Sequence, residues 1–213
     1  LAAGRSQKIN VLDTPKPLLR VYGKSLIVRQ IEVLREAGIR DIVIIAGSYS
    51  AEVRACVDDV GLSGVRIRYI KEPDDDAGIL RSFERAAQYV ESDCVITSCD
   101  LVFESNPYPT FSKQADIEIL VSKHQEENQF SGAPIRVKTK FNKLSEMSRV
   151  LDSYNALHAG IYYFTKQGID NFLRITQDSD PQEELSKVIM RLHSTNPIKL
   201  SFLPKMHWFD INA

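Results

Sequence analysis

The chain has 213 residues and a mass of 24.1 kDa, which is enough for one domain with a sizeable core. Hydrophobic residues make up 43% of the sequence and charged residues 26%, as in ordinary soluble globular proteins. The net charge of −1 excludes the strongly basic surface that nucleic-acid-binding domains normally need, so we expect no nucleic-acid partner.

The cysteines and the apolar runs indicate what kind of site the thiols form and whether the chain spans a membrane. Cys56, Cys94 and Cys99 show no close metal-binding spacing, and we interpret them as small apolar residues rather than as disulfide partners or nucleophiles. No apolar run approaches the ~20 residues that cross a bilayer, so the chain itself is not expected to span a membrane. No signal peptide is visible, although the chain starts without a methionine. The default compartment is therefore the cytoplasm.

The predicted elements alternate between strands and helices. β-branched runs bounded by turn residues predict buried strands, and apolar residues at helical spacing predict amphipathic helices. This order predicts a doubly wound α/β fold, and the absence of repeats or linkers predicts a single domain. The predicted helices are 24–37, 51–60, 79–90, 168–175 and 181–192, and the predicted strands are 41–47, 65–70, 94–100, 116–122, 135–138, 160–164 and a short one that closes at Asp210.

The first nineteen residues read LAAGRSQKINVLDTPKPLL. The small residues after Leu1 are typical of a buried strand end that another molecule approaches closely. Gly4 then opens a polar loop with cations at Arg5 and Lys8, followed by Lys16 between two prolines. Such a loop suits a polyanion such as a nucleoside triphosphate, and the alternative is a surface turn with solvated cations.

Two acidic features follow later in the chain. The strand 94–100 ends in Asp100, at the sheet edge where ligands of α/β proteins collect. Asp100 is therefore interpreted as a metal ligand, and the alternative is a simple cap at the end of the strand. The loop KEPDDDAG, residues 71–78, contains three consecutive aspartates, for which a solvated loop is favoured over a metal site.

The opening LAAG, the basic loop, PKPLL and the Gly23-Lys24 turn together resemble the sugar-phosphate nucleotidylyltransferase signature L-A-A-G-x-G-x-R…P-K-P-L. The sequence departs from it at Ser6, which replaces the second glycine, and at Lys8, which replaces the arginine. The resemblance covers nearly the whole chain. It implies a Rossmann-like, three-layer α/β/α nucleotidyltransferase fold with a mixed, mostly parallel central sheet.

The resemblance also implies roles at the nucleotide. Backbone amides around Gly4 and the side chains of Arg5 and Lys8 hold the triphosphate, while Lys16 meets the α-phosphate. The loop before the helix at Gly78 reads the nucleobase. The implied nucleotide-binding residues are Leu1, Ala2, Ala3, Gly4, Arg5, Lys16, Glu72 and Gly78.

Two motifs imply a Mg²⁺ site. The apolar strand ending in Cys99-Asp100 resembles the family's strand followed by Gly-Asp, with Cys99 in place of glycine. The segment Trp208-Phe209-Asp210 resembles the family's W-x-D ending, which supplies a second ligand. Asp100 and Asp210 are thereby the expected ligands of a hard cation.

An acceptor-binding segment is implied by SEMSRVLDSYNALHAGIYYF. Arg149 falls where the family has a lysine on the acceptor phosphate, and the alternative is an exposed strand cation. We count Lys8, Lys16 and Arg149 as catalytic. The acceptor contacts are expected at Arg149, Asn155, His158, Gly160 and Glu184.

The implied reaction is attack of a phosphate monoester on the α-phosphorus of a nucleoside triphosphate, with release of pyrophosphate. The monoester is already largely a dianion at neutral pH, so no general base is required. CTP and inositol 1-phosphate are favoured, the latter by the W-F-D-I-N ending. Hexose 1-phosphates remain open, as does phosphocholine, for which the chain offers aromatic residues Tyr154, Tyr162, Tyr163 and Trp208.

A different class, a nucleotide-binding regulatory module with weak catalysis, is supported by Ser6, Cys99 and the short stretch between Lys8 and Pro15. A nicotinamide oxidoreductase is disfavoured because G-x-G-x-x-G is missing after the first strand. We expect one nucleotidyltransferase domain over residues 1–213, cut short at both ends, with a possible fused domain beyond the C-terminus.

Overall fold

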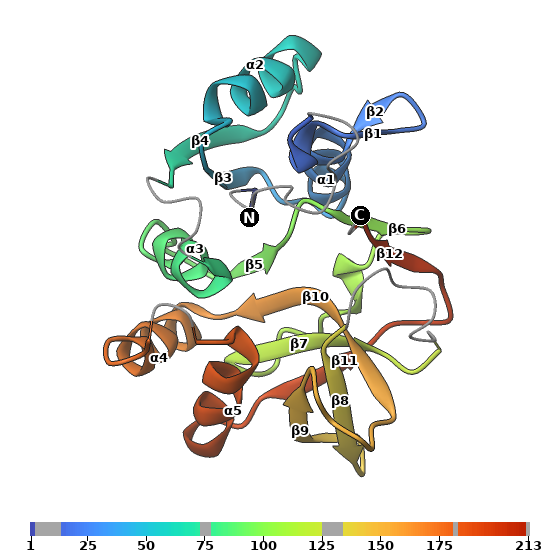
Figure 1. Cartoon of the computed structure of the whole chain (residues 1–213), viewed down its shortest axis with the longest axis vertical. Helices are drawn as coiled ribbons and strands as arrows, with labels where there is room; N and C mark the ends of the chain where they lie inside the picture. The colour runs from blue at the N-terminus through green and yellow to red at the C-terminus, as the bar shows by residue number, and fades with distance from the viewer. Residues whose placement is uncertain (3–13, 73–77, 125–133, 181–182, 212–213) are drawn as a thin grey trace.

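The computed structural model describes residues 1–2, 14–72, 78–124, 134–180 and 183–211 (Figure 1). The helices form where the apolar spacing predicts them. The first one begins two residues later than predicted, because Lys24 and Ser25 pair with an adjacent short strand. The helices are α1 (Leu26–Glu36), α2 (Ser50–Val60), α3 (Gly78–Ala87), α4 (Lys166–Thr176) and α5 (Leu185–Thr195), with 3-10 turns η1 (Lys16–Leu18) and η2 (Tyr108–Thr110).

The strands include several short ones that the sequence pattern missed. β1, β2, β6, β9 and β11 are missing from the predicted set. Four of them have two to four residues and carry little periodicity. The six-residue β9 has only Leu144 and Met147 as apolar residues, three positions apart. The strands are β1 (Arg20–Val21), β2 (Lys24–Ser25), β3 (Asp41–Ala46), β4 (Arg66–Lys71), β5 (Cys94–Thr97), β6 (Leu101–Phe103), β7 (Ile117–Ser122), β8 (Arg136–Lys140), β9 (Lys143–Ser148), β10 (Ala156–Phe164), β11 (Lys199–Phe202) and β12 (Trp208–Asp210).

The first two residues connect the two halves of the central sheet. Ala2 bridges Ala46 at the end of β3 in parallel orientation, and its N–H donates to Ile45 at 2.8 Å. On the other side, the nitrogen of Leu1 donates to the Thr97 carbonyl of β5 at 2.6 Å. The segment that follows Ala2 therefore begins at the carboxyl ends of β3 and β5.

The central sheet is mixed, and most of its strands run in one direction. β3 and β4 pair in parallel, as do β7 and β11. β10 is reversed, since it pairs antiparallel with β5, β7 and β8, and β9 is reversed as well, since it pairs antiparallel with β8. The expected mixed, mostly parallel sheet is confirmed, and the hairpin β8–β9 extends it beyond β10 (Figure 1).

Helices cover both faces of the sheet, which gives the predicted three layers. Consecutive residues of β10 alternate between two hydrophobic clusters: Ile161 packs in one and Tyr162 in the other. The first cluster contains the buried faces of α1 and α2, and the second those of α3, α4 and α5. The three cysteines are free thiols, in agreement with the sequence analysis. Among the described residues no helix is both long and apolar enough to span a membrane.

A buried carboxylate organises the amino-terminal edge of β7. Glu118 is fully buried, and its oxygens accept hydrogen bonds from Ser112 N at 3.0 Å, Ser112 Oγ at 2.6 Å, Gln114 N at 2.9 Å and Ser201 Oγ at 2.6 Å. Burial alone would raise the pKa of Glu118, but these hydrogen bonds outweigh it and hold the pKa below its ordinary value.

Glu118→Gln should lower the free energy of unfolding at pH 7 by about 3 kcal/mol. Each carboxylate oxygen of Glu118 accepts a hydrogen bond from a backbone N–H, of Ser112 or of Gln114. In the glutamine variant the amide NH₂ group would face one of these N–H donors and lose that hydrogen bond. The folded pKa is depressed, so this stabilisation is present above pH 4.5 and is lost as the pH falls through the folded pKa. Urea unfolding from pH 7 to pH 3 measures both effects. The control Glu146→Gln, in an exposed pair with Lys138, should change stability by less than about 0.5 kcal/mol. An equal decrease in the free energy of unfolding in Glu118→Gln and Glu146→Gln would contradict this role for Glu118.

Candidate active site

Lys16 is held on a rigid backbone at the carboxyl edge of the sheet. It begins the turn η1 between Pro15 and the buried Pro17, and Leu18 N donates to Pro15 O at 2.8 Å. The two prolines restrict the backbone on both sides of the lysine. Its ammonium forms an ion pair with Asp100 and lies 3.9 Å from the nearer carboxylate oxygen of Asp210. The three residues predicted to act on the phosphates and the metal are therefore neighbours.

The two acids are brought together by the ribbon of β6 and β12. Asp100 directly precedes β6, and Asp210 lies opposite Leu101 in the antiparallel pair. Ile211 N donates to Asp100 O at 2.9 Å, which fixes the spacing of the two backbones. Trp208 anchors β12: its side chain is buried and stacks on Phe103 with 6.0 Å between ring centroids.

The donor set fits Mg²⁺. Mg²⁺ is usually bound through one or two carboxylates and completes its shell with water and substrate phosphates. Asp100 and Asp210 supply the two carboxylates, with side chains 14% and 35% exposed. Within the described ranges no group of three or more His, Cys, Asp or Glu residues could hold a metal. The ammonium of Lys16 lies near both acids, so this position already holds one positive charge.

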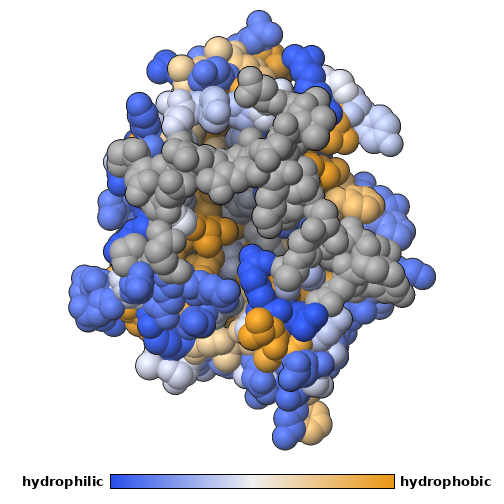
Figure 2. Space-filling view, in the orientation of Figure 1, coloured by the Kyte–Doolittle hydropathy of each residue, from blue (hydrophilic) through white to orange (hydrophobic). Residues whose placement is uncertain are grey.

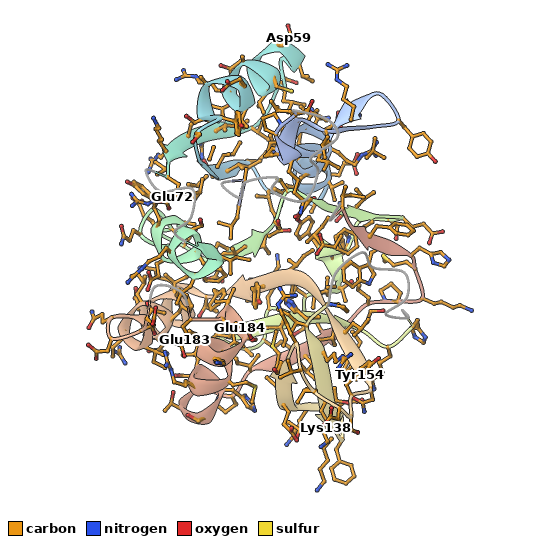
Figure 3. All side chains as sticks on the ribbon, viewed as in Figure 1. Asp59, Glu72, Lys138, Tyr154, Glu183 and Glu184 are labelled. Atoms are coloured by element: carbon orange, nitrogen blue, oxygen red, sulfur yellow. The ribbon has the colours of Figure 1, made fainter. Side chains whose placement is uncertain are left out.

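Glu72 has a structural partner next to the predicted base loop. Its side chain is 3% exposed and accepts from Arg85 Nε of α3 at 3.0 Å. Glu72 N also donates to Ala46 O at 2.7 Å. The residue thus ties the end of β4 to α3, at the place labelled in Figure 3. Gly78 starts α3 with φ +80°, a conformation that favours glycine.

The predicted acceptor segment comes together at the start of β10. Strand register places Ser148, which precedes Arg149, opposite Arg136, and Arg136 opposite Leu157. Arg149 is exposed, yet its charge acts on the rings of His158 and Tyr162, which lie 4.5 Å apart. The register thus places Arg149 one residue beyond the row Ser148, Arg136 and Leu157, and Leu157 is next to His158 in the chain.

His158 is a buried, neutral hydrogen-bond donor. Its Nδ1 accepts from Gly160 N at 3.3 Å, so the neutral ring carries its proton on Nε2. Burial lowers the pKa of His158 to about 3, and the charge of Arg149 adds to the effect. Nε2 is buried and has no hydrogen-bond partner among the described residues. A buried donor of this kind is costly unless a ligand or water accepts from it.

Two other predicted acceptor residues have packing or backbone contacts. Gly160 has φ +76°, and a Cβ there would lie 2.7 Å from the Leu101 side chain, next to Asp100. Its small size lets β10 pass close to Leu101, the residue after Asp100. The amide of Asn155 is exposed and bridges both main-chain groups of Thr139, at 2.8 and 3.1 Å.

Glu184 is the N-terminal cap residue of α5, and its neighbour Glu183 pairs with Arg191 at 2.9 Å. The Glu184 carboxylate is exposed and accepts from Ser186 Oγ at 3.2 Å (Figure 3). This position at a helix N-terminus favours a negative charge. The predicted nucleotide residues Ala3, Gly4, Arg5 and Lys8, and the three consecutive aspartates, lie outside the described residues.

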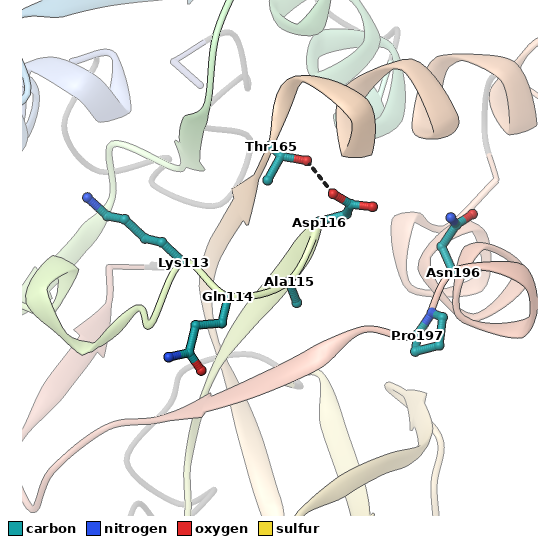
Figure 4. Close-up of a pocket in the computed structure, with 7 residues that line it drawn as sticks. All are labelled: Lys113, Gln114, Ala115, Asp116, Thr165, Asn196 and Pro197. Atoms are coloured by element: carbon teal, nitrogen blue, oxygen red, sulfur yellow. Dashed lines mark hydrogen bonds between the residues drawn. The ribbon is translucent and has the colours of Figure 1, made fainter.

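A hollow at the opposite edge of the sheet belongs to a different part of the molecule. It lies before β7 and is lined by residues 113–116, Thr165, Asn196 and Pro197 (Figure 4). Thr165 Oγ1 donates to Asp116 Oδ1 at 2.8 Å there.

On the face drawn in Figure 2, hydrophobic side chains are open to view near the middle, bordered by hydrophilic ones. Such a mixture of side chains is common around small-molecule sites.

Comparison with known proteins identifies the family. The family model described as the MobA-like NTP transferase domain matches residues 1–169, most of the chain. The chain belongs to this family. The matched residues include Lys16, Asp100 and the predicted acceptor residues Arg149 and His158, whereas Asp210 lies beyond them.

Individual relatives of this NTP transferase domain are distant. A bifunctional IPC transferase and DIPP synthase of Rubrobacter xylanophilus is 23% identical over 80% of this chain, and the chain spans 38% of that relative's length. The inositol-1-phosphate CTP transferase of T. maritima has a TM-score of 0.86 at 18% identity, over 100% of this chain and 87% of its own. A putative glucose-1-phosphate thymidylyltransferase of Bacillus anthracis has a TM-score of 0.84 at 17% identity, over 100% and 88%. These structures share the fold predicted from the sequence.

Proposed function

We propose that this protein transfers a nucleotidyl group from a nucleoside triphosphate, with CTP favoured, to a phosphate monoester such as inositol 1-phosphate, and releases pyrophosphate. The observation that carries the proposal is the cluster of Lys16, Asp100 and Asp210 at the carboxyl edge of the sheet. The names of the T. maritima and Rubrobacter proteins support a cytidylyl donor and an inositol-type acceptor. The name of the Bacillus protein supports a hexose 1-phosphate as the alternative.

The main barrier in this reaction is the approach of two anions. Two unit charges 4 Å apart repel by about 4 kcal/mol at an effective dielectric of 20, and both substrates carry more than one charge. Lys16 lies on the edge where the triphosphate loop begins, so its ammonium can neutralise the α-phosphate. Mg²⁺ on Asp100 and Asp210 would supply further positive charge to the phosphates. Electrostatic stabilisation and alignment then account for the catalysis.

The proposed acceptor site is the region of Arg149 and His158. Arg149 is an exposed positive charge that suits the monoester. The Nε2–H of His158 is buried without an acceptor among the described residues, so a hydroxyl oxygen that reached it would satisfy this donor. Of the four aromatic residues considered for a choline cage, Tyr162, Tyr163 and Trp208 are buried. The fourth, Tyr154, already has the Arg136 guanidinium 5.1 Å from its ring centroid. These contacts favour a phosphorylated polyol over phosphocholine.

A panel of four nucleoside triphosphates with inositol 1-phosphate, hexose 1-phosphates and phosphocholine tests the proposal. We expect Mg²⁺-dependent pyrophosphate release, fastest with CTP and inositol 1-phosphate. A preference for a hexose 1-phosphate or phosphocholine would replace the acceptor assignment. Binding of labelled triphosphate without pyrophosphate release from any pair would support the regulatory module instead.

Arg149→Ala should raise the acceptor KM about tenfold or more and leave the triphosphate KM nearly unchanged, because the lost contact concerns one substrate only. Initial rates with each substrate varied in turn measure both constants. The control Arg54→Ala removes an arginine that pairs with Asp58 on α2, and it should change neither constant. Equal effects of Arg149→Ala on both KM values would place Arg149 on the nucleotide side.

A further inference from the structure

The ammonium of Lys16 lies where a metal ion would have to bind. It pairs with Asp100 and lies 3.9 Å from Asp210, the two residues proposed to hold Mg²⁺. Asp100 and Lys16 are only 14% and 16% exposed, so water screens their charges weakly. An ammonium and a divalent cation repel at such short range and compete for the same carboxylate oxygens.

We propose that Lys16 is the internal counter-ion of the metal site: its single positive charge partly offsets the two carboxylates of Asp100 and Asp210 in the nucleotide-free protein and is displaced when a divalent cation binds. This inference rests on the proposed function for the assignment of the two acids as metal ligands. Lys16 then has two successive partners, first the acids and later the phosphates of the triphosphate.

The local structure permits this exchange. The backbone of η1 is fixed by Pro15 and Pro17, but the lysine side chain is a flexible four-carbon stem that carries a compact charge. The ammonium can therefore leave the acids without any movement of the main chain. An arginine at this position would keep the charge and the competition.

Coupling between metal and nucleotide follows from the exchange. Without nucleotide, a bound metal and the Lys16 ammonium compete for the same two carboxylates, so metal affinity is low. With nucleotide, the phosphates accept the ammonium, so each of metal and triphosphate strengthens binding of the other. Competition from Lys16 thus favours loading of metal and nucleotide together.

The test measures Mn²⁺ binding to the nucleotide-free protein by electron paramagnetic resonance and by calorimetry. Lys16→Met should bind Mn²⁺ about tenfold or more tightly than wild type, equivalent to about 1.4 kcal/mol. Lys16→Arg should stay close to wild type, because it retains a cation beside the acids. The matched control Lys138→Met removes the lysine of an exposed pair with Glu146, 3.0 Å apart on the β8–β9 hairpin, and should leave Mn²⁺ affinity unchanged (Figure 3).

Unchanged or weaker Mn²⁺ binding by folded Lys16→Met would overturn the inference, as would the absence of measurable binding to any variant. Circular dichroism of each variant confirms that it is folded. Pyrophosphate release is measured separately. Tighter Mn²⁺ binding by Lys16→Met in a protein that turns over no substrate pair would reject the proposed function and retain the inference. Metal-dependent turnover by the wild type, without tighter Mn²⁺ binding by Lys16→Met, would retain the proposed function and reject the inference.

Discussion

Lys16→Ala should lower kcat about a hundredfold or more, equivalent to roughly 2.7 kcal/mol of transition-state stabilisation. The lysine is the cation that the structure places at the carboxyl edge of the sheet, next to both proposed metal ligands. Removing it leaves the charge of the reacting phosphates uncompensated. The measurement is kcat per folded molecule, with the folded fraction taken from thermal unfolding.

The control for this variant is Lys138→Ala, which removes an exposed lysine of a different ion pair and should leave kcat within about twofold. Loss of kcat together with tighter Mn²⁺ binding in Lys16→Ala would show that the lysine acts on the phosphates and not as a support for the metal. If thermal stability falls while turnover per folded molecule persists, Lys16 is structural and the proposed role is wrong.

Asp100→Asn and Asp210→Asn should each raise the Mg²⁺ concentration needed for half-maximal activity by about tenfold or more, roughly 1.4 kcal/mol in metal affinity. An amide oxygen is a neutral and weaker ligand for a hard cation than a carboxylate. The effect should be larger for Asp100, whose side chain is 14% exposed, than for Asp210 at 35%, because a more buried charge is less screened.

A Mg²⁺ titration of activity, repeated with Mn²⁺, measures these shifts. Asp170→Asn is the matched control: it removes an acid that pairs with Lys166 at 2.6 Å on the surface of α4, far along the chain from both ligands. Its metal requirement should match that of wild type. Titrations that coincide for all three variants would rule out a metal site built on Asp100 and Asp210.

Much of the fold follows from local sequence. Helical spacing predicts α1 to α5, and β-branched runs predict β3, β4, β5 and β7, with differences of a few residues at the ends. β6 and β11 were missed because they have three and four residues and pair with strands far away in the chain. β9 lies next to its partner β8 but was missed because its apolar residues, Leu144 and Met147, do not alternate with polar ones. β10 begins four residues before the predicted strand, since Ala156 and its neighbours are fixed by pairing with β7 and β8.

For the candidate site, the sequence by itself determined which residue types carry charge and which strand ends they follow. It placed Lys16 in a rigid loop, Asp100 and Asp210 after apolar strands, and Arg149 before the acceptor strand. Only the tertiary structure decided their contacts: the ion pair of Lys16 with Asp100, the pair of Glu72 with Arg85, and the neutral ring of His158. The physical reason is that these contacts and the burial of His158 depend on strand order and register in the sheet, which join segments far apart in the chain and leave no local periodicity to read.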